Sequence, residues 1–306
     1  MAEEMVRDVG PAGITVAFER FGDPADPPVL LLMGGGAQMI NWPEGFCAEL
    51  VARGLHVVRF DNRDTGRSSR VENGPEPDLR AAMAGDFSSA SYTLSDMAAD
   101  TVGLVDRLGL ERVHLVGASM GGMIAQTVAV EFPQRVLSLT SIMSTTGDPA
   151  VGQADLRALG AVGAPPGTRA EFVRWQVAAL RAVSSPGFAF DEAGAAERAG
   201  RVFDRGFDLT GMLRQSVAVL ASGDRTEKLR GLQLPTVVIH GTEDRMCDVS
   251  GGRATAAAIP GAELVLVDGL GHGFPREVWP VFADHVLGVV RIAQRQGTVA
   301  QRQGAQ

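Results

Sequence analysis

A serine with the setting of a nucleophile lies between a predicted strand and a predicted helix. The segment Val113-His-Leu-Val-Gly-Ala-Ser-Met-Gly-Gly-Met123 contains the spacing Gly117-x-Ser119-x-Gly121. Glycines two residues to either side let a strand and a helix pass closely through a strained turn, which exposes the serine hydroxyl. The N-terminus of the following helix favours developing negative charge. Ser119 is therefore the candidate nucleophile, and the structural alternative is a serine that only caps a tight turn.

A serine hydroxyl is a weak nucleophile at neutral pH, so it needs a base, and the base needs an orienting acid. His272 follows the last predicted strand in the glycine-rich segment Gly269-Leu-Gly-His-Gly273. A loop in this place can carry an imidazole over the sheet edge to Ser119. We predict His272 as the general base. The other histidines lie in predicted strands or in the last helix and are assigned structural roles: His56, His114, His240 and His285.

The orienting acid is expected between the serine and the histidine in the chain, because that is the order of this kind of triad. Asp244 stands just past the predicted strand Thr236–His240 and is our prediction. Glu243 and Asp248 lie off that turn position. Asp148, which follows the preceding strand, is the main alternative.

A tetrahedral intermediate needs two backbone N–H donors, and loss of one such donor typically costs about 2.7–4 kcal/mol. The first predicted donor is Met120, the residue after the nucleophile. The second comes from Gly34-Gly35-Gly36, which follows the predicted strand Val29–Met33. We choose Gly35, with Gly34 as the alternative. The spacing fits no phosphate-binding loop.

The substrate pocket is expected to be lined by apolar residues near this loop. We predict Met33, Gly34, Met39 and Trp42 as substrate-binding residues, with Met120 beside them. Methionine and tryptophan also fill ordinary cores, so plain core packing is the alternative.

Short β-branched runs alternate with helical segments along most of the chain, which predicts an α/β fold with a mostly parallel central sheet flanked by helices. The strand runs are Ile14–Phe18, Val29–Met33, His56–Phe60, Val113–Val116, Val136–Ile142, Thr236–His240 and Glu263–Val267, and the main helical segments are Trp42–Arg53, Leu94–Leu108, Met120–Glu131, Gly251–Ala258 and Glu277–Ala293. Residues 146–231 show helical patterns without a convincing strand, and we expect an inserted helical cap over the carboxyl edge of the sheet. The catalytic core is then 1–145 with 232–293, and 294–306 is expected to be a disordered tail.

The composition of the chain argues against several classes of binding partner. The net charge is −8 and the pI is near 5.2, which disfavours nucleic acid and anionic membranes as main partners. No cluster with metal-ligand spacing or cofactor motif is present, so no metal and no cofactor are expected. Cys47 and Cys247 are expected to be single buried thiols. The acidic N-terminus and the lack of a long apolar run predict a cytoplasmic protein, by default a monomer or homodimer.

The assembled motifs resemble the α/β-hydrolase superfamily over most of the chain outside the cap and tail. The segment Phe60-Asp-Asn-Arg-Asp-Thr-Gly-Arg-Ser68 is similar to the loop of single-domain esterases of this group that ends in R-x-x-G-x-S. Within the superfamily the chain resembles the aclacinomycin methylesterase type, through Phe21–Pro27, Met33–Gly35, Trp42-Pro43, the Arg63–Ser68 loop and Val116–Gly121. The loop after Gly35 and the cap depart from that type.

The resemblance implies a fold, an activity and site residues. By motif position it implies Ser119, Asp244 and His272 as triad and Gly35 with Met120 as oxyanion hole, which agrees with the assignment from the residues alone. It implies a small-molecule ester substrate, such as a methyl ester. A carbon–carbon bond hydrolase or a cofactor-free perhydrolase would use the same triad. The alternative from another class is a small-molecule receptor without turnover.

Overall fold

The strands are built from apolar residues that alternate between two helical layers. In the computed structural model, which describes residues 2–155, 165 and 167–304, Leu30 and Leu32 of β3 pack with one core cluster. Val29 and Leu31 pack with the other. Because successive side chains of a strand point to opposite faces, an apolar run of this kind fits a sheet that is covered on both sides.

The sheet has eight strands in the order β1-β2-β4-β3-β5-β6-β7-β8. The strands are β1 Glu4–Val9, β2 Ile14–Phe21, β3 Pro28–Leu32, β4 His56–Phe60, β5 Val113–Ala118, β6 Val136–Ile142, β7 Thr236–Gly241 and β8 Glu263–Val267. β2 pairs antiparallel with β1 and β4, and the other neighbours are parallel. The predicted mostly parallel sheet is confirmed. Six of the seven predicted runs lie within strands, and the seventh, Val29–Met33, ends one residue past β3. Strand β1 is an addition.

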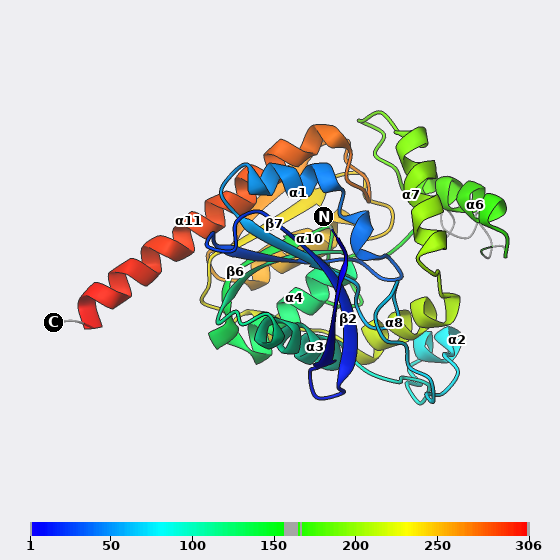
Figure 1. Cartoon of the computed structure of the whole chain (residues 1–306), viewed down its shortest axis with the longest axis horizontal. Helices are drawn as coiled ribbons and strands as arrows, with labels where there is room; N and C mark the ends of the chain where they lie inside the picture. Colours follow the sequence, from blue (N-terminus) through cyan, green and yellow to red (C-terminus); the bar gives the residue numbers. More distant parts are fainter. Residues whose placement is uncertain (1, 156–164, 166, 305–306) are drawn as a thin grey trace.

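Helices cover both faces (Figure 1). Helix α1 (Glu44–Val51) and α11 (Trp279–Gly304) contribute to one core cluster. Helices α3 (Leu94–Arg107), α4 (Met120–Glu131) and α10 (Val249–Ala258) contribute to the other. The remaining short elements are η1 Met39–Asn41, α2 Leu79–Met83, η2 Pro133–Arg135 and η3 Arg276–Val278.

The chain between β6 and β7 is helical in its described residues. It forms α6 (Arg169–Ala182), α7 (Glu192–Asp204), α8 (Leu209–Ser222) and α9 (Thr226–Leu229), and these residues form no strand. The predicted boundaries 146–231 include 156–164 and 166, which lie outside the described residues. We call 146–231 the insertion. Helices α6 and α7 stand beside the body of the molecule, whereas α8 lies below them, next to α2 (Figure 1).

The C-terminal segment differs from the prediction of a disordered tail from 294 onward. Helix α11 continues to Gly304, and its last part extends away from the body (Figure 1). The physical reason is local: 294–304 contains alanine, glutamine and arginine, which favour helix, and no proline. Residues 305 and 306 lie outside the described part. None of the described helices combines the length and apolarity needed to cross a bilayer.

Candidate active site

Ser119 lies in the sharp turn between β5 and α4. Its φ is 54° and its ψ −123°, a backbone conformation that few residues other than glycine adopt. Its amide donates to the carbonyl of Ile142 in β6 at 2.9 Å, which ties the turn to the neighbouring strand. Strain of this kind persists only where the surroundings hold it in place, and it is frequent at functional sites. The structure thus places Ser119 in the strained turn that its spacing predicts.

Two glycines allow the close contact between strand and helix at this turn. A Cβ on Gly117 would lie 2.2 Å from the carbonyl oxygen of Gly121, and a Cβ on Gly121 would lie 2.0 Å from that of Leu32. Both obstacles are backbone atoms of the sheet or of the first turn of α4, which cannot rotate away. The spacing Gly117-x-Ser119-x-Gly121 is therefore required for packing as well as for presenting the hydroxyl.

We expect Gly121→Ala to lower the free energy of unfolding by about 3–5 kcal/mol, because the methyl group forces β3 and α4 apart. Urea unfolding followed by circular dichroism measures the change. Gly288→Ala is the matched control, since nothing lies within 4 Å of a Cβ at this helical position. The control should be more stable than wild type by about 0.5–1 kcal/mol. Equal stabilities of the two variants would contradict the packing argument.

The imidazole of His272 is hydrogen-bonded to the carboxylate of Asp244. His272 follows β8, and its Nδ1 lies 2.7 Å from Oδ2 of Asp244, which follows β7. A carboxylate only accepts, so Nδ1 carries the proton and Nε2 is left as an acceptor. The amide of His272 donates to the carbonyl of Val183 in the insertion at 2.9 Å. The structure therefore brings the predicted base and acid together.

Asp244 is 5% exposed and fully hydrogen-bonded. Its Oδ1 accepts from the amides of Met246 at 2.8 Å and Cys247 at 2.9 Å. Burial opposes ionisation, but the nearby imidazoles of His240 and His272 hold the pKa of Asp244 well below its usual range. A carboxylate with a lowered pKa in this position is suited to stabilising a charged imidazole.

The alternative acids make other contacts. Asp148 accepts from the amide of Ala150 at 2.8 Å, within its own turn. Asp248 caps α10 through the amide of Ser250. The structural role predicted for His240 is confirmed, since its Nε2 lies 2.7 Å from the carbonyl oxygen of Cys247. Asp244 is the acid that the structure places on His272.

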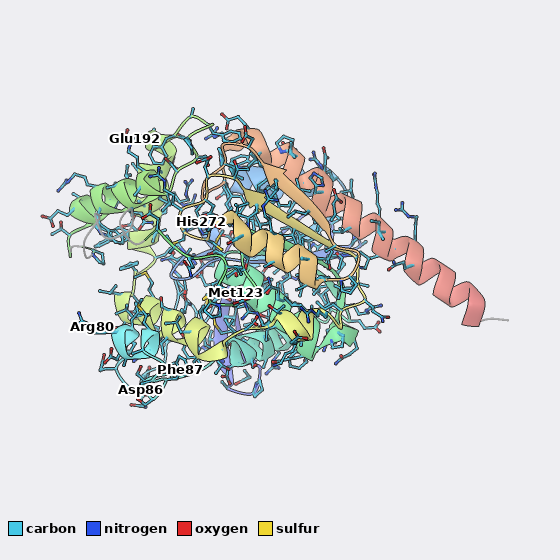
Figure 2. The ribbon with its side chains drawn as sticks, turned by 180° about the vertical axis from the view of Figure 1, so that it is seen from behind. Arg80, Asp86, Phe87, Met123, Glu192 and His272 are labelled. Atoms are coloured by element: carbon cyan, nitrogen blue, oxygen red, sulfur yellow. The ribbon has the colours of Figure 1, made fainter. Side chains whose placement is uncertain are left out.

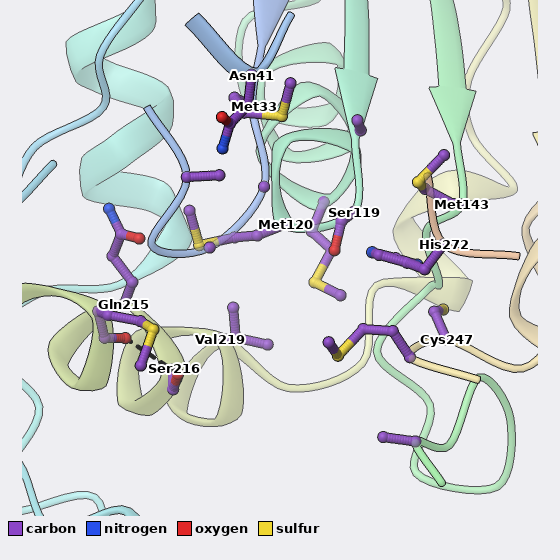
Figure 3. A pocket seen from close by; sticks show the side chains of 18 of the residues that line it. Met33, Asn41, Ser119, Met120, Met143, Gln215, Ser216, Val219, Cys247 and His272 are labelled. Carbon is purple, nitrogen blue, oxygen red and sulfur yellow. Dashed lines mark hydrogen bonds between the residues drawn. The ribbon is translucent and has the colours of Figure 1, made fainter. Parts of the chain in front are cut away.

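Ser119 and His272 line the same cavity and face one another (Figure 3). From the opposite side, His272 lies between the sheet and the helices of the insertion (Figure 2). No hydrogen bond joins the two side chains among the described contacts. Such bonds are often long without substrate and tighten when it binds. The structure thus supplies the orientation of the pair, with room for an approaching carbonyl.

The predicted oxyanion donors border the same turn. A Cβ on Gly34 would lie 3.1 Å from Cβ of Ser119, and one on Gly35 would lie 3.7 Å from Sδ of Met120. Within the described residues, the amides of Gly34, Gly35 and Met120 donate no hydrogen bond, and all three residues line the cavity. Free amides next to the nucleophile are suited to an anionic oxygen.

Gln215 of α8 holds this loop, a role that no local motif reveals. The side chain is wholly buried, and its Oε1 accepts from the amide of Gly36 at 2.7 Å. Its Nε2 donates to the carbonyl of Arg63 and to Oγ1 of Thr65, each at 2.7 Å. The insertion is therefore bonded both to the oxyanion loop and, through Val183, to the loop that carries His272.

The cavity has a volume of about 910 Å³ and a largely apolar lining rich in methionine. Its methionines are Met33, Met83, Met120, Met123, Met143, Met212 and Met246. Met83, Leu220 and Met246 are 63%, 37% and 37% exposed, so they mark where the cavity opens to solvent. Unbranched methionine side chains adapt to varied shapes, which suits a bulky apolar ligand.

Of the four residues predicted to bind substrate, two belong to the cavity lining and two do not. Met33 and Gly34 line the cavity. Met39 and Trp42 do not, and both side chains are fully buried. Met39 packs with Phe172 of α6, and Trp42 stacks on Phe46 of α1.

Neither thiol competes with Ser119 as nucleophile. Cys47 and Cys247 are free and buried, as predicted. Burial raises the pKa of Cys47 to about 12 and also raises that of Cys247, which lines the cavity, so both remain protonated. Among the described residues, no group of three or more histidine, cysteine or acidic side chains is placed to hold a metal ion.

Comparisons with known proteins identify the family of the chain. A family model described as the alpha/beta hydrolase fold matches residues 27–275. The chain is 29% identical to the rhodomycin D methylesterases DnrP of Streptomyces peucetius and DauP of Streptomyces sp. (strain C5), over 92% of this chain and 96% of each relative. The crystal structure of a hydrolase from Pseudomonas aeruginosa PA01 aligns with a TM-score of 0.67 at 24% identity, over 94% of this chain and 98% of that one.

The resemblance to the methylesterase type is thus confirmed by relatives that span nearly the whole chain. The family match runs from the start of the strand before the oxyanion loop to just past His272, and so includes every predicted site residue. The chain is a hydrolase enzyme and belongs to the alpha/beta hydrolase fold family.

Proposed function

We propose that this hydrolase cleaves carboxylic esters by way of an acyl-enzyme on Ser119. One observation carries the proposal: the hydroxyl of a strained serine faces an imidazole whose other nitrogen lies 2.7 Å from a buried carboxylate. This is the arrangement that activates a serine nucleophile. The two methylesterase relatives support an ester as the substrate.

The reaction follows from the positions of these groups. Oγ of Ser119 attacks the ester carbonyl while Nε2 of His272 takes its proton, and the amides of Gly35 and Met120 hold the oxyanion. His272 then gives the proton to the departing alkoxide. A water molecule, deprotonated by His272, attacks the acyl-enzyme and releases the acid. Asp244 stays ionised throughout and stabilises the charged imidazole.

The substrate is proposed to be a bulky, largely apolar methyl ester. A cavity of about 910 Å³ is large enough for a polycyclic acid, and its methionines provide an adaptable apolar wall. We assign the insertion as a cap because α6, α7 and α8 contribute Leu180, Val202 and Met212 to this wall. Closure of a cap excludes water from the charged intermediate.

The test combines covalent labelling with turnover. We expect a fluorophosphonate to modify Ser119 stoichiometrically, as located by peptide mass spectrometry, and His272→Ala to abolish the labelling. Wild-type protein should also release methanol from methyl esters. A different result would be labelling of Ser119 without hydrolysis of any ester, together with cleavage of a carbon–carbon bond or with perhydrolysis. That result would support the proposed triad and refute an ester as the substrate. A folded protein that binds esters but is neither labelled nor active would be a receptor.

A further inference from the structure

The cavity wall contains one formally charged side chain that the proposed reaction does not use. Among the described residues that line the cavity there is no aspartate, glutamate or lysine, and the single arginine is Arg198 of α7. Apart from His272, the rest of the wall is neutral and mostly apolar. A guanidinium in such a wall is costly to desolvate unless an anion or another acceptor meets it.

Arg198 differs from the other partly or fully buried arginines in having no partner. Each of the others that the structure describes donates to a carboxylate or to a backbone carbonyl: Arg53, Arg59, Arg63, Arg135, Arg205, Arg214 and Arg225. Arg198 makes no hydrogen bond or ion pair with any described residue. Burial lowers its pKa, and the charge of Asp191 only partly offsets this. Its donors are therefore available to a ligand.

Two neutral donors accompany Arg198 on neighbouring elements. Asn41 of η1 and Gln176 of α6 also line the cavity, and within the described residues neither side chain has a hydrogen-bond partner. Figure 3 shows Asn41 next to Met33 at the cavity. Three polar side chains with unused donors in an apolar cavity are the pattern by which a pocket orients a polar group of its ligand.

The elements that carry these donors are fixed to one another. Met39 and Ile40 of η1, Phe172 of α6 and Val202 of α7 form a separate core cluster. Nε2 of Gln38 donates to the carbonyl of Val202 at 2.9 Å. Because η1 follows the oxyanion loop directly, these contacts connect α7 to the loop beside Ser119. Arg198 therefore lies on an element that is packed against the part of the chain that carries the oxyanion donors.

We propose that Arg198, assisted by Asn41 and Gln176, binds a carboxylate on the substrate, so that the substrate is an ester with a second, free acid group. Arginine matches a carboxylate with two parallel hydrogen bonds, which fixes orientation as well as charge. The identity of the substrate rests on the proposed function. The binding of a carboxylate by Arg198 does not depend on turnover, and the two can therefore fail separately.

The first test compares two matched series of p-nitrophenyl esters, one with a terminal carboxylate and one with a terminal carboxamide, at glutarate, adipate and suberate length. Wild type should prefer the carboxylate at one or more lengths. Arg198→Met should lower kcat/KM for that carboxylate by about 10- to 100-fold, mainly through KM, since hydrogen bonds to charged groups contribute this much. The carboxamide should change by less than about threefold.

Two further variants separate recognition from structure. Arg201→Met removes the same charge one turn along α7, where Arg201 is exposed and pairs with Glu44, and should leave both series unchanged. Arg198→Lys should recover part of the carboxylate preference, because it keeps the charge without the two-pronged geometry. Equal losses for both series in Arg198→Met, or no preference in wild type at any length, would overturn the proposal.

A binding experiment covers the case in which no ester is cleaved. Calorimetry on wild type should show that suberic acid monoamide binds at least about tenfold more tightly than neutral suberamide, and that Arg198→Met removes the difference. If no ester is hydrolysed but the monoamide still binds more tightly than suberamide, the proposed function is refuted and the carboxylate site is supported. Turnover without a difference in either experiment would keep the function and refute the site.

Discussion

Replacing Ser119 by alanine is expected to lower kcat for ester hydrolysis by about four to six orders of magnitude, because triad members act as a unit and the remaining groups only bind and polarise the ester. The fold should not change. The Ser119 hydroxyl makes no hydrogen bond to any described residue, and alanine keeps the Cβ in the same strained turn. Single-turnover and steady-state rates on one methyl ester, with unfolding measured in parallel, check both statements.

The matched control is Ser144→Ala. Ser144 is a buried serine close to α4 whose Oγ has no hydrogen-bond partner among the described residues, and it does not line the cavity. Its loss should leave kcat within about threefold of wild type. If Ser119→Ala retained a tenth or more of the wild-type kcat, as an order of magnitude, the hydrolysis would need another nucleophile.

The predictions that succeeded depend on local patterns. The strand before Ser119 and the helix after it are found where their residues predict them, with α4 at Met120–Glu131 in both. The glycines around Ser119 allow a close contact between a strand and the helix that follows it. The sequence of this short segment is therefore enough to predict the turn. The positions of Asp244 and His272 are local in the same sense, since they lie in the loops after β7 and β8, whose carboxyl ends meet at one edge of a parallel sheet. Their catalytic roles stay predictions.

The features that the sequence does not reveal depend on contacts between distant segments. Gln215 bonds to Gly36, 179 residues away, and no pattern around either residue indicates this pairing. Met39 and Trp42 were predicted in the cavity because they are apolar and near the oxyanion loop, but α7 and α1 pack over them. Arg198 lies in a helix that contains many polar residues. That it lines the cavity depends on how α7 packs against α6 and η1, which its own sequence does not show.

At both ends of the chain the secondary structure differs from the prediction. Strand β1 has mostly exposed or half-exposed residues, so its sequence Glu4-Met-Val-Arg-Asp-Val9 lacks the buried run that marked the other strands. It is specified by pairing with β2 at the sheet edge. Helix α11 continues past 293 on helix propensity without an apolar pattern. Residues 294–297 are exposed, as is much of β1, and neither segment lines the cavity.

Asp244→Asn is expected to lower kcat by about 10⁴-fold with little change in KM, because the amide favours the wrong tautomer of His272. Oδ1 of an asparagine can still accept from the amides of Met246 and Cys247. Its NH₂ group then faces Nδ1 of His272, which must become the acceptor, and the proton moves to Nε2. In that form His272 cannot take the proton of Ser119.

Asp148→Asn is the control that separates the two acids, since the substitution is the same and Asp148 also follows a strand. Its carboxylate serves the turn at Ala150, so kcat should stay within about threefold of wild type. The decisive measurement is kcat for both variants at saturating ester, with fluorophosphonate labelling rates beside it. A large loss in Asp148→Asn and a small one in Asp244→Asn would show that Asp148, and not Asp244, is the acid that orients His272. It would also mean that the 2.7 Å contact between Asp244 and His272 serves structure alone.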